Sequence, residues 1–400
     1  MIAMLDVLLG PTQVGTIALL PQRKSLFVFD EAYSRKPKRP VLSQSYFDAS
    51  GELRQETRST RVKLPAWFSN LLPEGRLREY LAQLGGIHVT HEFELLRLLG
   101  EDLPGAVRVI AHADSVRQIH EAPKREAIAG DAPLRFSLAG VQLKFSALAN
   151  NHGGLTIPAS GIGGDWIVKL PSPNCPAVPE NEAAMLSLAA AVGIAVPEHR
   201  LVPLAAIEGL PELGPFAGSK ALAVKRFDRE GENRIHIEDF AQVFGVFPDE
   251  KYEKVGFARI AEMIAIVMGQ EAAQEFVARL VFTILTGNGD MHLKNWSLIY
   301  RDGRTPNLSP AYDLVSTVPY IPKDGLALNF LGKKEFAAVT RERFKRFAQK
   351  ASLSENETAS TVSRIIDSVK SAWGEQRRNS EVPPEIADRI ENHILRMLVA

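Results

Sequence analysis

The chain has 400 residues, of which 45% are hydrophobic and 24% are charged, so it carries enough apolar material for sizeable cores. Its 47 basic residues balance 47 acidic ones, and this neutrality gives no overall electrostatic reason to bind nucleic acid or an anionic membrane. One cysteine, Cys175, excludes an intrachain disulfide and fits a reducing compartment. No signal-peptide pattern or membrane-length apolar run is evident, so we expect a cytoplasmic protein without membrane contact.

The first third of the chain reads as strands followed by helices. Apolar, β-rich runs occupy residues 14–20 and 25–33, and the four residues between them suit a hairpin connection. Helical periodicity follows at residues 77–84 and 92–99, and Gly100 is a suitable end for the second helix. Residues 111–133 are polar, charged and alanine-rich, which predicts a linker or an exposed helix between modules.

The rest of the chain changes from strands to helices. Candidate strands lie at residues 144–149, 166–170 and 220–227, with one helix inserted at about 181–192. Helices dominate from residue 237 onward. Ser352 and Glu355 resemble a capping box, and Pro384 suits the first position of the last helix. We therefore expect an α+β chain with three units: a mixed module (1–125), a β-rich lobe (126–229) and a helical lobe (230–400).

The most informative segment is the loop at residues 287–295, which follows an apolar run. Asp290, Asn295 five residues later and Asp313 have the spacing of a protein-kinase-like phosphotransfer site. There Asp290 would orient the attacking hydroxyl, and Asn295 and Asp313 would offer the hard oxygen ligands that magnesium prefers. His292 is expected to brace the loop. The alternative is a solvated turn with Asp290 as a helix cap.

A lysine in an otherwise apolar strand is the second kinase-like feature. Lys169 lies in the run at residues 166–171, where a buried ammonium needs a partner. An ATP phosphate and a carboxylate of the following helix would serve, and we favour Glu182 over Glu180. The alternative is a lysine that snorkels from an edge strand.

A phosphate-covering loop is the third requirement. Residues 137–146 contain the small residues Ala139 and Gly140, which allow backbone amides to approach a phosphate, and Lys144 adds positive charge. An ordinary turn between strands would look similar.

Taken together, these motifs resemble the HipA family, the serine/threonine-kinase toxins of bacterial HipA–HipB toxin–antitoxin modules. The matching segments run in order along nearly the whole chain: residues 70–75, 100–106, 137–146, 166–171, 179–182, 224–229, 238–240, 287–295 and 312–317.

The resemblance implies a bilobal protein-kinase-like fold with an extra N-terminal α/β subdomain and a helical C-terminal lobe, binding ATP and Mg²⁺. It implies that Asp290 is catalytic and that Asn295 and Asp313 hold the metal. The nucleotide-binding residues that it implies are Ala139, Gly140, Val141, Gln142, Leu143, Lys144, Lys169, Glu182, Lys225, Arg226, Phe227, His292, Lys294, Asn295, Tyr312 and Asp313.

The resemblance also implies regulation and partners. Ser137 occupies the position at which family members phosphorylate themselves, and a phosphate there would repel the nucleotide phosphates and disfavour the closed loop. An aminoacyl-tRNA synthetase is the expected substrate. A HipB-like helix-turn-helix antitoxin is the expected partner, with DNA contacted only through that complex.

Three residues depart from the usual family pattern. Lys225 stands where an acidic residue is usual, Gly289 where threonine is usual, and Leu143 where glutamate is frequent. None removes a group that the chemistry requires, so we expect activity. The rival hypotheses are a weakly active or inactive kinase-fold co-repressor acting through a DNA-binding partner, and a kinase of small molecules or lipids.

Overall fold

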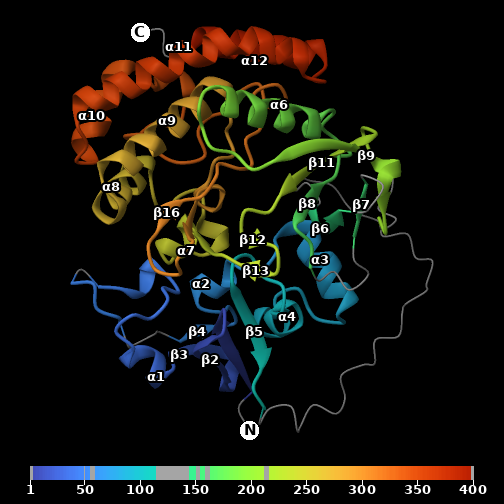
Figure 1. The fold of residues 1–400 in the computed structure, drawn as a ribbon, viewed down its shortest axis with the longest axis vertical. Coiled ribbons are helices and arrows are strands. Elements are labelled where there is room, and N and C mark those ends of the chain that lie inside the picture. The colour runs from blue at the N-terminus through green and yellow to red at the C-terminus, as the bar shows by residue number, and fades with distance from the viewer. Residues whose placement is uncertain are drawn as a thin grey trace.

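The computed structural model describes residues 3–48, 50–54, 59–113, 144–149, 154–157, 163–210 and 216–397. Figure 1 shows an N-terminal module, a β-sheet beside it and a layer of helices at the opposite end of the molecule. The expected linker lies outside the described residues from residue 114 onward. Within the part of the chain that the structure covers, no helix has the length and apolarity needed to cross a bilayer.

The N-terminal module is built on an antiparallel sheet with strand order β4-β3-β2-β1-β5. Alternate residues of β1, namely Leu5, Val7 and Leu9, face the buried side, as expected for a strand with one face in a core. The strands are β1 (Ala3–Leu9), β2 (Thr12–Leu20), β3 (Lys24–Phe29), β4 (Thr60–Arg61) and β5 (Val107–Ala111); the helices are α1 (Glu31–Arg35), α2 (Ala66–Ser69), α3 (Gly75–Leu84) and α4 (Glu92–Leu99).

The second strand expected in this module ends four residues earlier than predicted. The strand expected at residues 25–33 ends at Phe29, because the Asp30 side chain accepts a hydrogen bond from the Tyr33 N–H and caps α1. The helix expected at 92–99 is confirmed as α4, with Gly100 at its C-terminal cap.

The second part is a six-stranded sheet with strand order β10-β7-β6-β8-β11-β9, and α6 packs against β11 and β9. Strand β8 pairs with β6 on one side and β11 on the other, so it is an interior strand. The elements are β6 (Lys144–Ala149), β7 (Leu155–Thr156), β8 (Trp166–Lys169), α6 (Val178–Ala191), β9 (His199–Pro203), β10 (Ile207–Glu208) and β11 (Lys220–Lys225). The edge-strand alternative for Lys169 is therefore wrong.

The C-terminal part is mainly helical, and α9 is packed between α8, α11 and α12 (Figure 1). Its helices are α7 (Phe240–Val243), α8 (Phe257–Met268), α9 (Gln270–Thr286), α10 (Arg341–Lys350), α11 (Glu355–Asn379) and α12 (Pro384–Arg396), and its short strands are β12 (Arg229–Glu230), β13 (Asn233–Arg234), β14 (His236–Asp239), β15 (Ser297–Tyr300) and β16 (Asn307–Leu308). The predicted capping box is two residues out of place: Ser354, not Ser352, caps α11, and it accepts from Glu357 N–H.

A buried carboxylate joins the N-terminal module to the C-terminal part. Glu238 on β14 accepts hydrogen bonds from Tyr300 Oη at 2.5 Å, Gln44 N at 3.0 Å and Trp67 Nε1 at 3.3 Å. Burial raises the pKa of Glu238 to about 7, although these donors act to lower it.

This carboxyl should make stability depend on pH. Between about pH 4.5 and pH 7 the folded protein holds the Glu238 proton that the unfolded chain has released, so the free energy of unfolding falls as pH rises through that window. We expect Glu238→Gln to remove this contribution to the slope. The free energy of unfolding of the variant, relative to that of wild type, should therefore rise by about 3 kcal/mol between pH 4.5 and pH 7. Urea unfolding at several pH values measures this. For the control Glu253→Gln, at an exposed position, the plot of unfolding free energy against pH should run parallel to that of wild type. A parallel plot for Glu238→Gln would show that Glu238 does not cause the pH dependence.

Candidate functional site

The loop after α9 presents the predicted catalytic aspartate. Helix α9 ends at Thr286, Gly287 adopts a left-handed conformation with φ 65°, and the Asn288 N–H closes the helix end on the Thr283 carbonyl at 3.0 Å. A β-carbon at Gly287 would lie 2.6 Å from a methyl group of Val318. The chain thus turns sharply out of a buried helix into residues 288–295.

Asp290 is exposed and held at both its backbone and its side chain. Tyr252 Oη donates to Asp290 Oδ1 at 2.7 Å, and Asn295 Nδ2 donates to the Asp290 carbonyl at 2.8 Å. Its own N–H donates to Asn288 Oδ1 at 3.0 Å. Partial desolvation by the surrounding protein raises the pKa of Asp290, while the bond from Tyr252 acts to lower it. Asp290 lies beyond the helix end and does not cap it, and its exposed carboxylate already accepts one hydroxyl, that of Tyr252.

Lys169 is buried on β8 between two carboxylates from different elements. Its Nζ lies 2.5 Å from Glu182 Oε1 on α6 and forms an ion pair with Asp313. Burial acts to lower the pKa of Lys169, but Asp313 and Glu182 outweigh it and raise the pKa above its usual value. Burial likewise opposes ionisation of Asp313, yet Lys169 and Lys144 hold its pKa well below the usual range. Burial raises the pKa of Glu182, although Lys169 acts to lower it. The triad joins the sheet, α6 and the segment at Asp313.

Asp313 is held against the loop of Asp290. It has a left-handed backbone with φ 53°, and its carbonyl accepts from Asn288 Nδ2 at 3.1 Å. Three residues on, Ser316 exchanges hydrogen bonds of 2.9 and 3.1 Å with the Asn181 side chain of α6. Asp313 therefore connects the 288–295 loop, through Asn288, to Lys169.

The donor set suits a magnesium ion shared with phosphates. The side-chain nitrogen of Asn295 donates to the Asp290 carbonyl, so the side-chain oxygen of Asn295 remains available as a metal ligand. Asp313 supplies a carboxylate. Magnesium is commonly bound by one or two such oxygens together with phosphate oxygens and water. Among the described residues there is no group of three or more His, Cys, Asp or Glu side chains that would hold a metal alone.

Other predicted residues of the loop are engaged inside the protein. Burial lowers the pKa of His292 to about 3, so its ring is neutral, and it packs edge-on against Tyr252 at 5.0 Å, as expected of a bracing residue. Tyr312 Oη donates to the Lys294 carbonyl at 2.8 Å. Lys294 Nζ lies 2.5 Å from Glu74 Oε1 of the N-terminal module.

The predicted hinge follows β11. Lys225 is exposed, 3.4 Å from Glu198, while the Arg226 guanidinium is buried and donates to both oxygens of Asp228 at 2.8 and 2.9 Å. The side chain of Arg226 thus serves a buried ion pair. Phe227 lies near Tyr312, with ring centroids 5.6 Å apart.

The predicted phosphate loop lies outside the described residues up to Leu143, and its last three residues, Lys144, Phe145 and Ser146, begin strand β6. Its remaining predicted members, together with the predicted phosphosite, are Ser137, Ala139, Gly140, Val141, Gln142 and Leu143.

Comparison with known proteins assigns the family. The HipA N-terminal domain matches residues 5–110, and the HipA-like C-terminal domain matches residues 136–373. The chain belongs to the HipA family. It is 48% identical to "Putative kinase Y4dM" of Sinorhizobium fredii over 98% of this chain and 96% of that protein. It is 28% identical to "Serine/threonine-protein kinase toxin HipA" of Shewanella oneidensis over 69% of this chain and 68% of that protein.

A solved structure matches the fold. HipA of Shewanella oneidensis MR-1, in a complex with HipB and its operator DNA, superposes with a TM-score of 0.75 at 23% identity. The match covers 98% of this chain and 96% of that chain. The predicted α+β, bilobal kinase-like fold with an extra N-terminal subdomain is confirmed.

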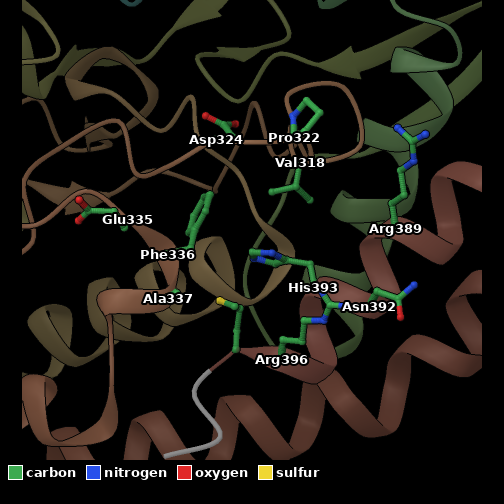
Figure 2. Close-up of a pocket in the computed structure, with 11 residues that line it drawn as sticks. Val318, Pro322, Asp324, Glu335, Phe336, Ala337, Arg389, Asn392, His393 and Arg396 are labelled. Carbon is green, nitrogen blue, oxygen red and sulfur yellow. The ribbon is translucent and has the colours of Figure 1, made fainter.

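Gly289, a departure from the usual HipA pattern, has a structural reason. A β-carbon there would lie 2.2 Å from an oxygen of Asp324. The Asp324 carboxylate accepts a hydrogen bond from Thr317 Oγ1, and the same hydroxyl oxygen accepts one from the Gly289 N–H at 2.7 Å. Asp324 also borders a hollow of about 470 Å³ whose opposite wall is α12, where Arg389 and His393 lie (Figure 2). No spacing rule relates positions 289 and 324, so the sequence alone did not reveal this contact.

We expect Gly289→Ala to lower the free energy of unfolding by about 1–3 kcal/mol, because the added methyl must displace a held carboxylate. Adding Asp324→Ala should recover part of the loss, so the two changes should be non-additive. Urea unfolding measures both. Gly374→Ala in α11, where a methyl meets only Arg378 at 3.8 Å, is the control and should be neutral or stabilising. Equal effects at the two glycines would contradict the packing argument.

Proposed function

We propose that this chain is an ATP- and Mg²⁺-dependent protein serine/threonine kinase of the HipA toxin type. The observation that carries the proposal is the Lys169–Glu182–Asp313 triad beside a loop that presents Asp290 and Asn295. Phosphoryl transfer has a loose transition state, so these are the groups that it needs: positive charge on the phosphates, oxygen ligands for the metal and a carboxylate at the attacking hydroxyl.

Each residue has a distinct role in this proposal. The bound ATP and magnesium supply the transferable phosphoryl group and neutralise its charge. Lys169, oriented by Glu182, holds the phosphates through its ammonium group. Asp313 and Asn295 hold the metal. Asp290, whose carboxylate is fixed by Tyr252, orients the hydroxyl group of the substrate and accepts its proton.

The HipA resemblance extends the proposal to regulation and partners. We propose Ser137 as the autophosphorylation site that silences the kinase and an aminoacyl-tRNA synthetase as the substrate whose modification arrests translation. The HipA chain of the solved complex is bound to HipB and operator DNA, which supports a HipB-like antitoxin here, with DNA contacted only through it. We place the protein in the cytoplasm, with residues 1–125, 126–229 and 230–400 as its three units.

The direct test is intact mass after dephosphorylation and incubation with ATP and magnesium, for wild type and Asp290→Asn. We expect one phosphate on the wild type alone, mapped to Ser137. Labelled ATP and cell extract then identify the substrate class. Label confined to lipid or metabolite fractions would refute a protein kinase, and no transfer to any fraction would favour a co-repressor.

A further inference from the structure

A residue of the N-terminal module reaches both segments that hold Asp290. Glu74, in the connection between α2 and α3, lies more than 170 positions from its partners in sequence. Its Oε2 is 2.6 Å from Lys251 Nζ, and its Oε1 is 2.5 Å from Lys294 Nζ. The Lys294 ammonium also donates to the Asn70 carbonyl at 3.2 Å. Within the described part of the chain, both hydrogen-bond acceptors of Lys294 Nζ thus belong to the N-terminal module.

The two lysines are each next to a residue that contacts Asp290. Lys251 precedes Tyr252, whose hydroxyl donates to Asp290 Oδ1 at 2.7 Å. Lys294 precedes Asn295, whose amide donates to the Asp290 carbonyl at 2.8 Å. The Glu74 carboxylate therefore connects the segment that holds the Asp290 side chain, through Tyr252, to the segment that holds its backbone, through Asn295.

The electrostatics of this contact favour a fixed arrangement. Burial acts to raise the pKa of Glu74, but Lys294 and Lys251 outweigh it and lower the pKa to about 2. The two lysine side chains are about 15% exposed, and Glu74 is 31% exposed. Without Glu74, two largely covered ammonium groups would have no carboxylate between them, so the segments of Tyr252 and Asn295 would each lose an ion pair to the N-terminal module.

We infer that Glu74 is a positioning residue for phosphoryl transfer, through which the N-terminal module completes the geometry around Asp290. This inference rests on the proposed function. Glu74 acts through Lys251 and Lys294 and does not itself meet the nucleotide. The kinase site is consequently shared between the N-terminal module and the C-terminal lobe.

The test compares Glu74→Gln, which keeps the shape and removes the charge, with Glu74→Asp and with Lys63→Met. Lys63 is the control because it forms another ion pair between the same two parts, with Asp249 at 2.8 Å, and both side chains of that pair are exposed. A displacement of about 1 Å in a catalytic group can cost about 100-fold in rate, so we expect kcat of Glu74→Gln to fall at least tenfold. Glu74→Asp should recover part of that loss, and Lys63→Met should match wild type.

Two readouts separate positioning from a loss of folded protein. Calorimetric titration with magnesium and the non-hydrolysable analogue AMP-PNP should give Glu74→Gln a wild-type stoichiometry and an affinity within about threefold, because the Lys169 triad is unchanged. Hydrogen exchange of the peptide covering residues 288–295 should be faster in Glu74→Gln than in wild type. A reduced stoichiometry, or unchanged exchange with unchanged kcat, would overturn the inference.

A double variant tests the route. If Glu74 acts through Lys294, Glu74→Gln added to Lys294→Met should lower kcat little beyond Lys294→Met alone. If the fold-losses in kcat of the two single variants multiply in the double variant, Glu74 does not act through Lys294. Absence of nucleotide binding and transfer in the wild type would refute the proposed function itself, whereas a fully active Glu74→Gln beside an active wild type would refute only this inference.

Discussion

Replacement of Asp290 by asparagine should lower kcat for phosphoryl transfer by about 10³-fold, within the range that a positioned acid or base contributes. Asparagine keeps the size of the side chain and can still accept the Tyr252 hydrogen bond, but it cannot accept a proton from the substrate. The nucleotide is held by other groups, so the affinity for ATP should stay near that of wild type.

Transfer of labelled phosphate and calorimetric titration with ATP measure the two quantities separately. Asp302→Asn is a suitable control, because Asp302 is an exposed aspartate whose carboxylate accepts from the Thr305 and Arg304 N–H groups of its own turn. It should leave kcat unchanged. If Asp290→Asn keeps more than about a tenth of the wild-type kcat, Asp290 is not the residue that receives the proton.

Replacement of Lys169 by methionine should remove nucleotide binding and also destabilise the fold. Removing one partner of a buried ion pair typically costs about 3–5 kcal/mol, because the other charge is left buried. Here Glu182 is 2% exposed and would lose its nearest cation. We expect the urea midpoint to fall clearly and calorimetric titration with ATP to show no binding.

A second change distinguishes stability from function. In Lys169→Met/Glu182→Gln the more deeply buried of the two unpaired carboxylates is gone and only Asp313 remains, so stability should partly return while nucleotide binding stays lost. Lys220→Met is the control, because Lys220 pairs with Glu381 at the surface, where such a pair contributes roughly 0–1 kcal/mol. Recovery of ATP binding in the double variant would show that Lys169 does not hold phosphates.

Local patterns predicted the elements well where one rule governs a position. The apolar runs that became β8 and α9 were recognisable from composition, and Pro384 begins α12 as expected. Boundaries failed where two rules compete. Asp30 ends a strand that the apolar pattern would continue, and Ser354 takes the cap that Ser352 could equally have provided.

The candidate site divides in the same way. The chain carries Asp290, Asn295 and Asp313 within 24 positions of each other, so their spacing alone predicted a shared site. Lys169 was recognisable as a charge that needs a partner, and the choice of Glu182 over Glu180 agrees with the contact seen. Tyr252, Glu74 and Asp324 were missed, because the contacts that link them to the loop of Asp290 span 35 or more positions and no periodic pattern relates them.

The sequence by itself determined the reaction class to propose and the residues that would carry it, because phosphoryl transfer needs particular oxygen and nitrogen groups and short motifs supply them in order. Only the tertiary structure decided how those groups are held. Burial between β8 and α6 makes Lys169 pair with two carboxylates, and packing of the N-terminal module puts Glu74 beside the loop of Asp290. The physical reason is that charge pairing and steric exclusion depend on distances in space, which separation along the chain does not specify.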